Sequence, residues 1–296
     1  MAQDCSDVPE EYARLIQLFQ HTNQAFPFEG NRIAVYTEGY TKLQSLLREL
    51  QKAKQHIHIE YYIFEDDAIG RLVRDVLIEK ASQGVEVRVI YDDVGCWHVP
   101  NRFFEEMRNA GIEVRSFLKV RFPLFTSRVN YRNHRKIVVI DGRIGFVGGM
   151  NLAERYMRGF SWGIWRDTHI LIEGKAVHGL QTAFLLDWYF VDRTLITASR
   201  YFPKIESCGS SLVQVVTSEP IGPWKEIMQG LTMAINGAKK YFYMQTPYFL
   251  PTEQVLAAMQ TAALAGVDVR LMLPERADNR ITHLGSHSYL ADVMQA

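Results

Sequence analysis

Two stretches of this chain repeat one another at nearly constant spacing, and the repeat limits the folds open to it. Residues 53–64, AKQHIHIEYYIF, are similar to residues 238–249, AKKYFYMQTPYF. Residues 81–92, ASQGVEVRVIYD, are similar to residues 262–274, AALAGVDVRLMLP. The offsets are 185 (238 minus 53) and 182 (266 minus 84, from the matched glycines). A period of this length indicates two copies of a domain, not a solenoid of short repeats.

Helix and strand patterns alternate within the first copy. Apolar residues at helical spacing over 43–50 precede a strand-like run at 56–64, and a helix predicted over about 68–83 precedes a strand at 85–93. Gly84 separates that helix from its strand, as expected for a helix end. Such alternation is typical of an α/β fold in which helices flank a mostly parallel sheet.

The domain boundaries follow from the repeat. We expect a leading helix and linker over residues 1–30, with the breaker-rich FPFEGN near its end, a first domain over 31–205 and a second over 210–296. The second copy is predicted to be incomplete. His134 lies 50 residues after Gly84, so its counterpart would fall near position 316 (266 plus 50), whereas the sequence has 296 residues. We therefore expect a truncated chain or a natural half that needs a partner.

Composition narrows the class of protein. The 33 basic and 33 acidic residues give a formal net charge of zero, which argues against a nucleic-acid wrapper. Cys5, Cys96 and Cys208 form no metal-binding pattern and fit a reducing compartment. No run of about 18 apolar residues predicts a transmembrane helix, and the first residues lack the pattern of a signal peptide.

The pattern H-x-K-x4-D, made by His134, Lys136 and Asp141, carries the most chemical information. The β-branched run IVVI between the lysine and the aspartate predicts a strand buried on both faces. Alternation places His134 and Lys136 on one face and Asp141 on the other. We therefore assign Asp141 a supporting role at the strand end.

An imidazole beside a lysine suits attack on a phosphodiester. The neighbouring cation disfavours protonation of His134, so the neutral ring is available as a nucleophile near pH 7. Lys136 can offset the negative charge of the ester and gains most as charge builds on the equatorial oxygens.

Five further residues are candidates for this site. Gly148 and Gly149 let the backbone approach a phosphate, and Asn151 can donate an amide hydrogen bond or cap the following helix, although a Gly-Gly pair can also be only a turn. Asp167, before an apolar strand, is our candidate for orienting the imidazole, or else an ordinary strand-edge aspartate. Glu60 is expected to line the cleft, since the repeat has Gln245 in its place.

The stretch NHRKIVVIDG, with GGMN and WRDTH after it, resembles the HxKxxxxD motif of the phospholipase D superfamily. HIEYYIFEDDAIG, GVEVRVIYDDVG and QTPYFLP are similar to bacterial cardiolipin synthases in particular. The resemblance implies a phospholipase D-like mixed sheet flanked by helices, and a phosphohistidine at His134. It also implies phosphate binding by Lys136 and Asn151, without metal or cofactor.

The same resemblance implies a phosphatidyltransferase that moves a phosphatidyl group from one phosphatidylglycerol to the hydroxyl of a second and releases glycerol. A second HxKxxxxD motif, in cis or in trans, would supply general acid and base; this chain does not contain it. Two alternatives stay open: a phosphodiesterase or nuclease of the same superfamily, and a non-catalytic half that binds lipid or a partner subunit.

A membrane partner is expected from local charge. Residues 115–140 contain seven lysines and arginines but no acidic residue, and RFPLF at 121–125 could present aromatic side chains to an anionic membrane surface. A solvated basic loop is the other interpretation. We expect the cytoplasmic face of a bacterial cell membrane as the location, and no nucleic-acid partner.

Overall fold

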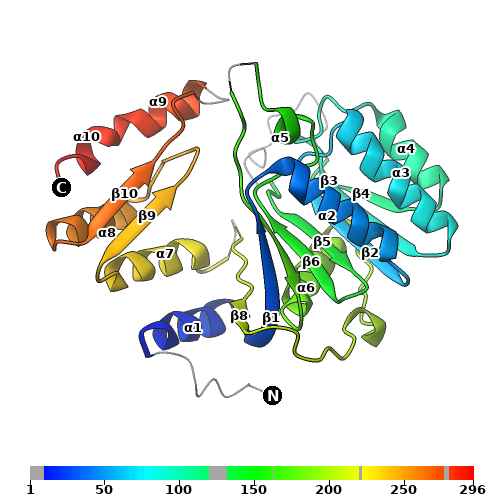
Figure 1. Cartoon of the computed structure of the whole chain (residues 1–296), viewed down its shortest axis with the longest axis horizontal. Coiled ribbons are helices and arrows are strands. Elements are labelled where there is room, and N and C mark those ends of the chain that lie inside the picture. Colours follow the sequence, from blue (N-terminus) through cyan, green and yellow to red (C-terminus); the bar gives the residue numbers. More distant parts are fainter. Residues whose placement is uncertain (1–9, 120–131, 162, 220–221, 277–279) are drawn as a thin grey trace. The chain divides into compact units, whose positions relative to one another are not determined.

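The computed structural model describes residues 10–119, 132–161, 163–219, 222–276 and 280–296, and these fall into two units (Figure 1). One unit is Pro27–Val215. The other combines the described residues before Pro27 with those from Val216 onward.

The first unit is built on an eight-stranded sheet with the order β4-β3-β2-β5-β6-β7-β1-β8. Strands β2, β3 and β4 pair in parallel, and the other pairings are antiparallel. The strands are β1 Pro27–Tyr36, β2 His56–Tyr61, β3 Glu86–Asp92, β4 Glu113–Phe117, β5 Lys136–Ile140, β6 Ile144–Gly148, β7 His169–Glu173 and β8 Ser211–Gln214. The helices are α2 Gly39–Lys52, α3 Ala68–Ser82, α4 Asn101–Asn109, α5 Arg155–Arg158 and α6 Val177–Asp192, with a 3-10 turn at Ser199–Tyr201. The mixed sheet flanked by helices is confirmed, whereas the mostly parallel sheet expected from the alternation is wrong, because β5, β6, β7, β1 and β8 pair antiparallel.

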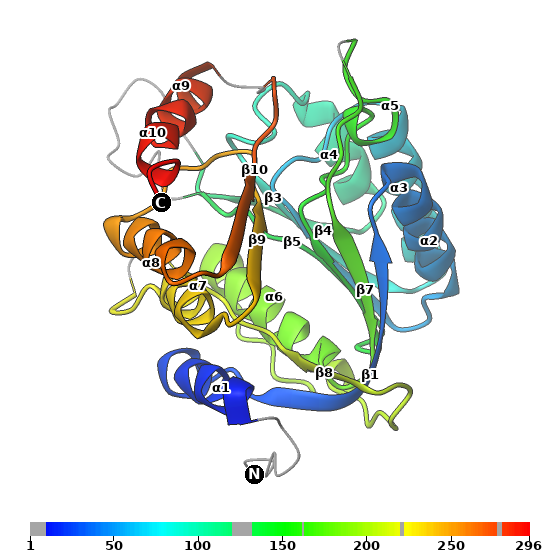
Figure 2. The ribbon, with the colours of Figure 1, turned by 60° about the vertical axis from the view of Figure 1, so that its left-hand side comes forward.

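Helices cover both faces of the central strands (Figure 2). On β5, Val138 and Ile140 pack with α2, α3 and α4, whereas Ile137 and Val139 pack against α6. All four side chains are buried, which confirms the strand predicted from IVVI. Burying such a side chain stabilises a fold by about 1.5–3 kcal/mol, so both faces hold β5 in register.

The linker expected up to residue 30 is wrong for its last residues. Strand β1 begins at Pro27 and runs through the breaker-rich segment. Gly30 has a φ of 73°, and the pairing of β1 with β8 shifts register between Phe28 and Asn31. A glycine at positive φ accommodates such a bulge, and a proline is tolerated at the first residue of a strand.

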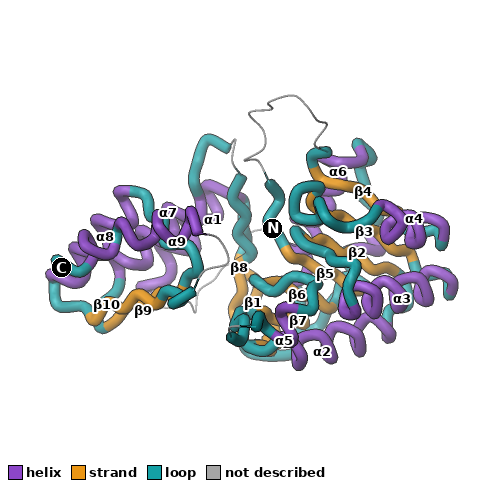
Figure 3. The backbone as a smooth tube through the Cα atoms, turned by 90° about the horizontal axis from the view of Figure 1, so that it is seen from above, coloured by secondary structure: helices purple, strands orange, loops and turns teal. Residues whose placement is uncertain are grey.

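The second unit repeats the strand-helix-strand arrangement of the first (Figure 3). Strands β9 Tyr241–Gln245 and β10 Asp268–Met272 pair in parallel, with Tyr241 opposite Asp268. In the first unit His56 lies opposite Glu86, so the paired residues differ by the sequence offsets, 56 plus 185 and 86 plus 182. The helices are α1 Glu10–Asn23, α7 Glu226–Gly237, α8 Glu253–Leu264, α9 Arg280–Ser288 and α10 Leu290–Val293. The duplication is confirmed.

The core of this unit lies between α7, α8 and one face of the two strands. Helix α1 adds to it by packing on α7, where a Cβ at Gly230 would lie 2.1 Å from the Phe19 ring. None of the helices in the described ranges is long and apolar enough to cross a bilayer.

Candidate active site

His134 and Lys136 meet where β5 begins. Lys136 is the first residue of the strand and lies opposite Tyr61 of β2. Its Nζ is 2.9 Å from Nδ1 of His134 and donates to the His134 carbonyl oxygen at 2.6 Å. The Tyr62 ring lies against the imidazole, with centroids 4.5 Å apart. The imidazole remains exposed, whereas the lysine is buried.

The protonation states of this pair suit nucleophilic chemistry. Burial and the Lys136 charge lower the pKa of His134 to about 4. Burial lowers the pKa of Lys136 to about 8, and the carboxylates of Asp167 and Asp92 limit that fall. At pH 7 the ring is therefore neutral and most of the lysine charged. With an ammonium donor at Nδ1, the neutral ring carries its proton on Nε2.

Asp167 lies beside Gly149, on the side of Lys136. A Cβ at Gly149 would come within 2.0 Å of Oδ1 of Asp167, so only glycine leaves room for this carboxylate. Oδ1 accepts the N–H of Thr168 at 2.6 Å. Within the described ranges no hydrogen bond joins Asp167 to His134. Its negative charge acts on Lys136 and on Lys42 of α2 instead.

Gly148 opens space for a buried histidine that sequence analysis missed. Gly148 pairs with His169 of β7, and a Cβ at Gly148 would lie 2.7 Å from Nδ1 of His169. His169 is fully buried, and both ring nitrogens lack a hydrogen-bond partner among the described residues. Burial, with Lys42 and Lys136 nearby, holds the pKa of His169 well below its usual value.

Lys42 is a second buried cation that the sequence analysis missed. Its Nζ donates to the Tyr61 hydroxyl at 2.8 Å, and burial lowers its pKa to about 7 despite Asp167. Lys42 lies one turn before Leu46, which is on the buried face of α2. That helical spacing was a signal for its burial.

Asn151 and Asp141 hold backbone segments in place. Oδ1 of Asn151 accepts the N–H of Ile63 at 3.1 Å, and Nδ2 donates to the Tyr156 hydroxyl at 2.6 Å. Asp141, at a φ of 52°, accepts the N–H groups of Lys54, Gln55 and His56 at 2.8–3.0 Å, fixing the start of β2. Phosphate binding by Asn151 stays a prediction.

Glu60, expected to line a cleft, is buried on the α6 face with a relative exposure of 1%. Its Oε1 accepts a hydrogen bond from Asn133, the residue before His134. Asn133 also contacts Asp187 of α6. Sequence analysis missed Asn133 and Asp187, because their contacts join segments distant in the chain.

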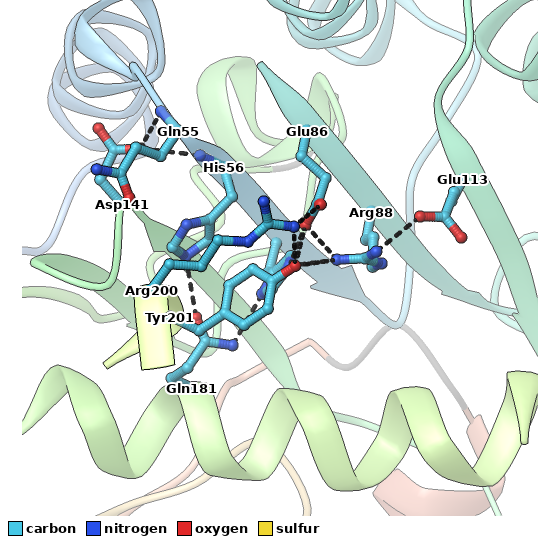
Figure 4. A network of polar contacts seen from close by, with 10 residues as sticks. Gln55, His56, Glu86, Arg88, Glu113, Asp141, Gln181, Arg200 and Tyr201 are labelled. Carbon is cyan, nitrogen blue, oxygen red and sulfur yellow. Dashed lines mark hydrogen bonds and ion pairs between the residues drawn. The ribbon is translucent and has the colours of Figure 1, made fainter. Parts of the chain in front are cut away.

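The other end of β2 carries a separate polar network (Figure 4). Gln181 of α6 bridges His56 and His58, with contacts of 3.1 and 2.8 Å. Glu86 of β3 accepts hydrogen bonds from Tyr201 and Arg200, each at 2.6 Å. These contacts fasten the segment after α6 to the sheet, so we interpret the network as structural.

Three arginines of the basic stretch pair with carboxylates of the same unit. Arg115 binds Asp192 at 2.5 Å, Arg132 lies 3.7 Å from Asp92, and Arg135 binds Asp187. RFPLF lies outside the described residues, and the membrane contact proposed for it stays a prediction.

Comparison with known proteins places the chain in a family. Residues 46–188 and 231–296 match the family described as "Cardiolipin synthase, PLD-like domain". The chain is 44% identical over 270 residues to a cardiolipin synthase of Geobacillus kaustophilus, which covers 90% of this chain and 54% of that protein. It is 41% identical to the major cardiolipin synthase ClsA of Bacillus subtilis over 95% of this chain and 59% of that protein. The chain thus spans a little over half the length of these relatives.

A solved structure supports the fold. Phosphatidylserine synthase of Haemophilus influenzae has a TM-score of 0.64 at 14% identity, over 95% of this chain and 73% of that one. At this identity the likeness concerns the fold alone.

Proposed function

This chain belongs to the phospholipase D-like domain family of cardiolipin synthases, and on that premise we propose that it carries the nucleophilic half of a phosphatidyltransferase. The substrates are two phosphatidylglycerol molecules, and the products are cardiolipin and glycerol. The observation that carries the proposal is the contact of 2.9 Å between a neutral imidazole and a charged lysine.

In the first step, a phosphodiester oxygen replaces Nδ1 of His134 as acceptor for the Lys136 ammonium. The exposed ring then changes tautomer through solvent: Nε2 loses its proton to water and Nδ1 takes one up from water, which leaves a lone pair at Nε2. Asp167 is our candidate to receive the Nδ1–H bond. Nε2 bonds to phosphorus, and the bond between phosphorus and the oxygen of the glycerol headgroup breaks. The leaving oxygen takes a proton from a general acid.

In the second step, the hydroxyl of another phosphatidylglycerol attacks the phosphohistidine. The bond between phosphorus and Nε2 breaks and cardiolipin leaves, while the attacking hydroxyl gives its proton to the group that acted as acid. That group comes from a second HxKxxxxD-bearing half. Lys136 offsets charge on the equatorial oxygens in both steps, and no metal or cofactor takes part.

The lipid substrate places the reaction at a membrane surface. We propose that the site works at the cytoplasmic face of a bacterial membrane, where anionic headgroups are concentrated. Replacing Lys119, Arg121 and Arg128, which leaves Lys136 and the arginines paired with Asp192, Asp92 and Asp187 in place, should then weaken binding to anionic vesicles. Unchanged binding would remove the docking role but not the chemistry.

The test uses phosphatidylglycerol labelled in its phosphatidyl group, given to the chain alone and to the chain mixed with a carboxy-terminal half that bears the second motif. We expect cardiolipin from the mixture, and label on the chain that survives alkali and is released by acid. His134→Gln should abolish both signals. Product or adduct formed equally well by that variant would refute the mechanism, and neither signal in any arm would favour a binding half.

A further inference from the structure

The residues on either side of His134 point away from it, toward α6. Alternation along the segment places His134 and Lys136 on one side and Asn133 and Arg135 on the other. Asn133 is held at both ends of its side-chain amide: Nδ2 donates to Glu60 and, at 3.1 Å, to Asp187, while Oδ1 accepts the N–H of Arg135 at 3.0 Å. Its own N–H donates to Asp92 at 3.3 Å. The segment carrying the nucleophile is thus fixed from beneath.

The charges in this cluster do not balance if both acids are ionised. Glu60 and Asp187 are 1% and 7% exposed, and both accept from the same amide nitrogen of Asn133. Arg135 forms an ion pair with Asp187. Two further titratable side chains face this cluster: Asp92 at the end of β3, and His58, two residues before Glu60 on β2. Two buried carboxylates this close cannot both remain charged at modest cost.

One oxygen identifies where a proton belongs. Oε2 of Glu60 is buried and has no hydrogen-bond partner among the described residues, whereas Oδ2 of Asp187 accepts from both Asn133 and Arg135. A carboxylate oxygen buried without a donor is unfavourable, but a protonated one becomes a donor itself. Burial and the Asp187 charge, partly offset by Arg135, also raise the pKa of Glu60 well above its usual value.

The internal repeat points the same way. Gln245 of β9 occupies the position equivalent to Glu60 of β2, 185 residues on. Glutamine has the shape of a protonated glutamate, with one acceptor oxygen and one donor, and it cannot replace an ionised carboxylate at equal charge.

We propose that Glu60 is protonated in the resting protein and, as a neutral carboxylic acid, positions His134 by accepting from Asn133 while donating its own proton to Asp187. The inference deepens the proposed function of the same site and rests on it. Glu60 and Asn133 are positioning residues, since neither touches the reacting atoms.

The first test needs no activity. Infrared difference spectra of the whole chain at pH 7, Glu60→Gln against wild type, should show one protonated carboxyl band in the wild type that the variant lacks. Asp187→Asn should also remove that band, because Glu60 would then ionise beside Arg135. A wild type without such a band, or a band unaffected by Glu60→Gln, overturns the proposal even if the enzyme has no measurable turnover.

The second test measures cardiolipin formation with the complementing half. Glu60→Gln should keep kcat within about twofold, whereas Glu60→Ala and Asn133→Ala should lower it roughly tenfold to a hundredfold with little change in KM, as expected for a misplaced nucleophile. Thermal unfolding identifies any variant that fails to fold, and Glu60→Gln serves as the folded reference. A Glu60→Gln variant as impaired as Glu60→Ala would overturn the proposal, and so would full activity in both.

Discussion

Acidification should destabilise the first unit by protonating His58. This side chain is fully buried, stacks on Phe184 with centroids 4.5 Å apart, and accepts a hydrogen bond at Nδ1 from Nε2 of Gln181. Burial lowers its pKa from 6.5 to about 4, with Glu86 partly opposing the fall. A lowered folded-state pKa means that the unfolded chain takes up the proton first. Stability is therefore full above pH 6.5 and is lost as the pH falls toward 4.

The magnitude follows from the two pKa values. Between pH 7 and pH 5, a shift from 6.5 to about 4 changes the free energy of unfolding by about 2 kcal/mol. Urea unfolding at both pH values gives this difference for the wild type. In His58→Gln the same difference should shrink by about 2 kcal/mol, whatever the absolute stability of the variant. His21→Gln, at an exposed position of α1, is the matched control. An undiminished pH dependence in His58→Gln would refute the reasoning.

Three further predictions concern the site. The rate of the complemented enzyme should fall above pH 8, as Lys136 loses its proton, and near pH 4, as His134 gains one. Lys136→Arg should raise the pH at which the alkaline fall occurs, in whatever activity remains. If that pH does not change, another group is responsible for the fall. Lys42→Met should raise the free energy of unfolding at pH 7 by about 3 kcal/mol. The substitution removes a buried cation whose pKa is lowered from 10.5 to about 7, and this gain is larger than the loss of one hydrogen bond to Tyr61. The gain in stability should vanish above pH 10, which chemical unfolding can check. Gly149→Ala should displace the Asp167 carboxylate and cost about 1–3 kcal/mol together with most of the activity, and a variant of normal stability and rate would contradict the close approach.

Local patterns in the sequence were sufficient for the repeat, for β5 and for the pairing of His134 with Lys136. The offset of 185 residues predicted two equivalent strands, and β2 and β9 are those strands. Strand β1 was not predictable, because it is stabilised by pairing with β7 and, around the bulge at Gly30, with β8, both far along the chain. Lys42 of α2 and His169 of β7 lie near the site only because the helix packs on the sheet and the strand pairs within it. Neither residue type by itself indicates that it will lie there.

The spacing H-x-K has a consequence for the residues between and before its members. Because His134 and Lys136 use one side of an extended segment, Asn133 and Arg135 are directed to the other side by the same geometry. A nucleophile at the exposed start of a strand needs restraint, and only the opposite side can supply it without obstructing the phosphate. A buried acid there meets two opposed demands, since a second carboxylate charge beside Asp187 would be costly to bury, whereas an apolar side chain would leave Asn133 without an acceptor. A neutral carboxylic acid satisfies both, and the second copy has an amide of the same shape, Gln245, at the equivalent position in the sequence.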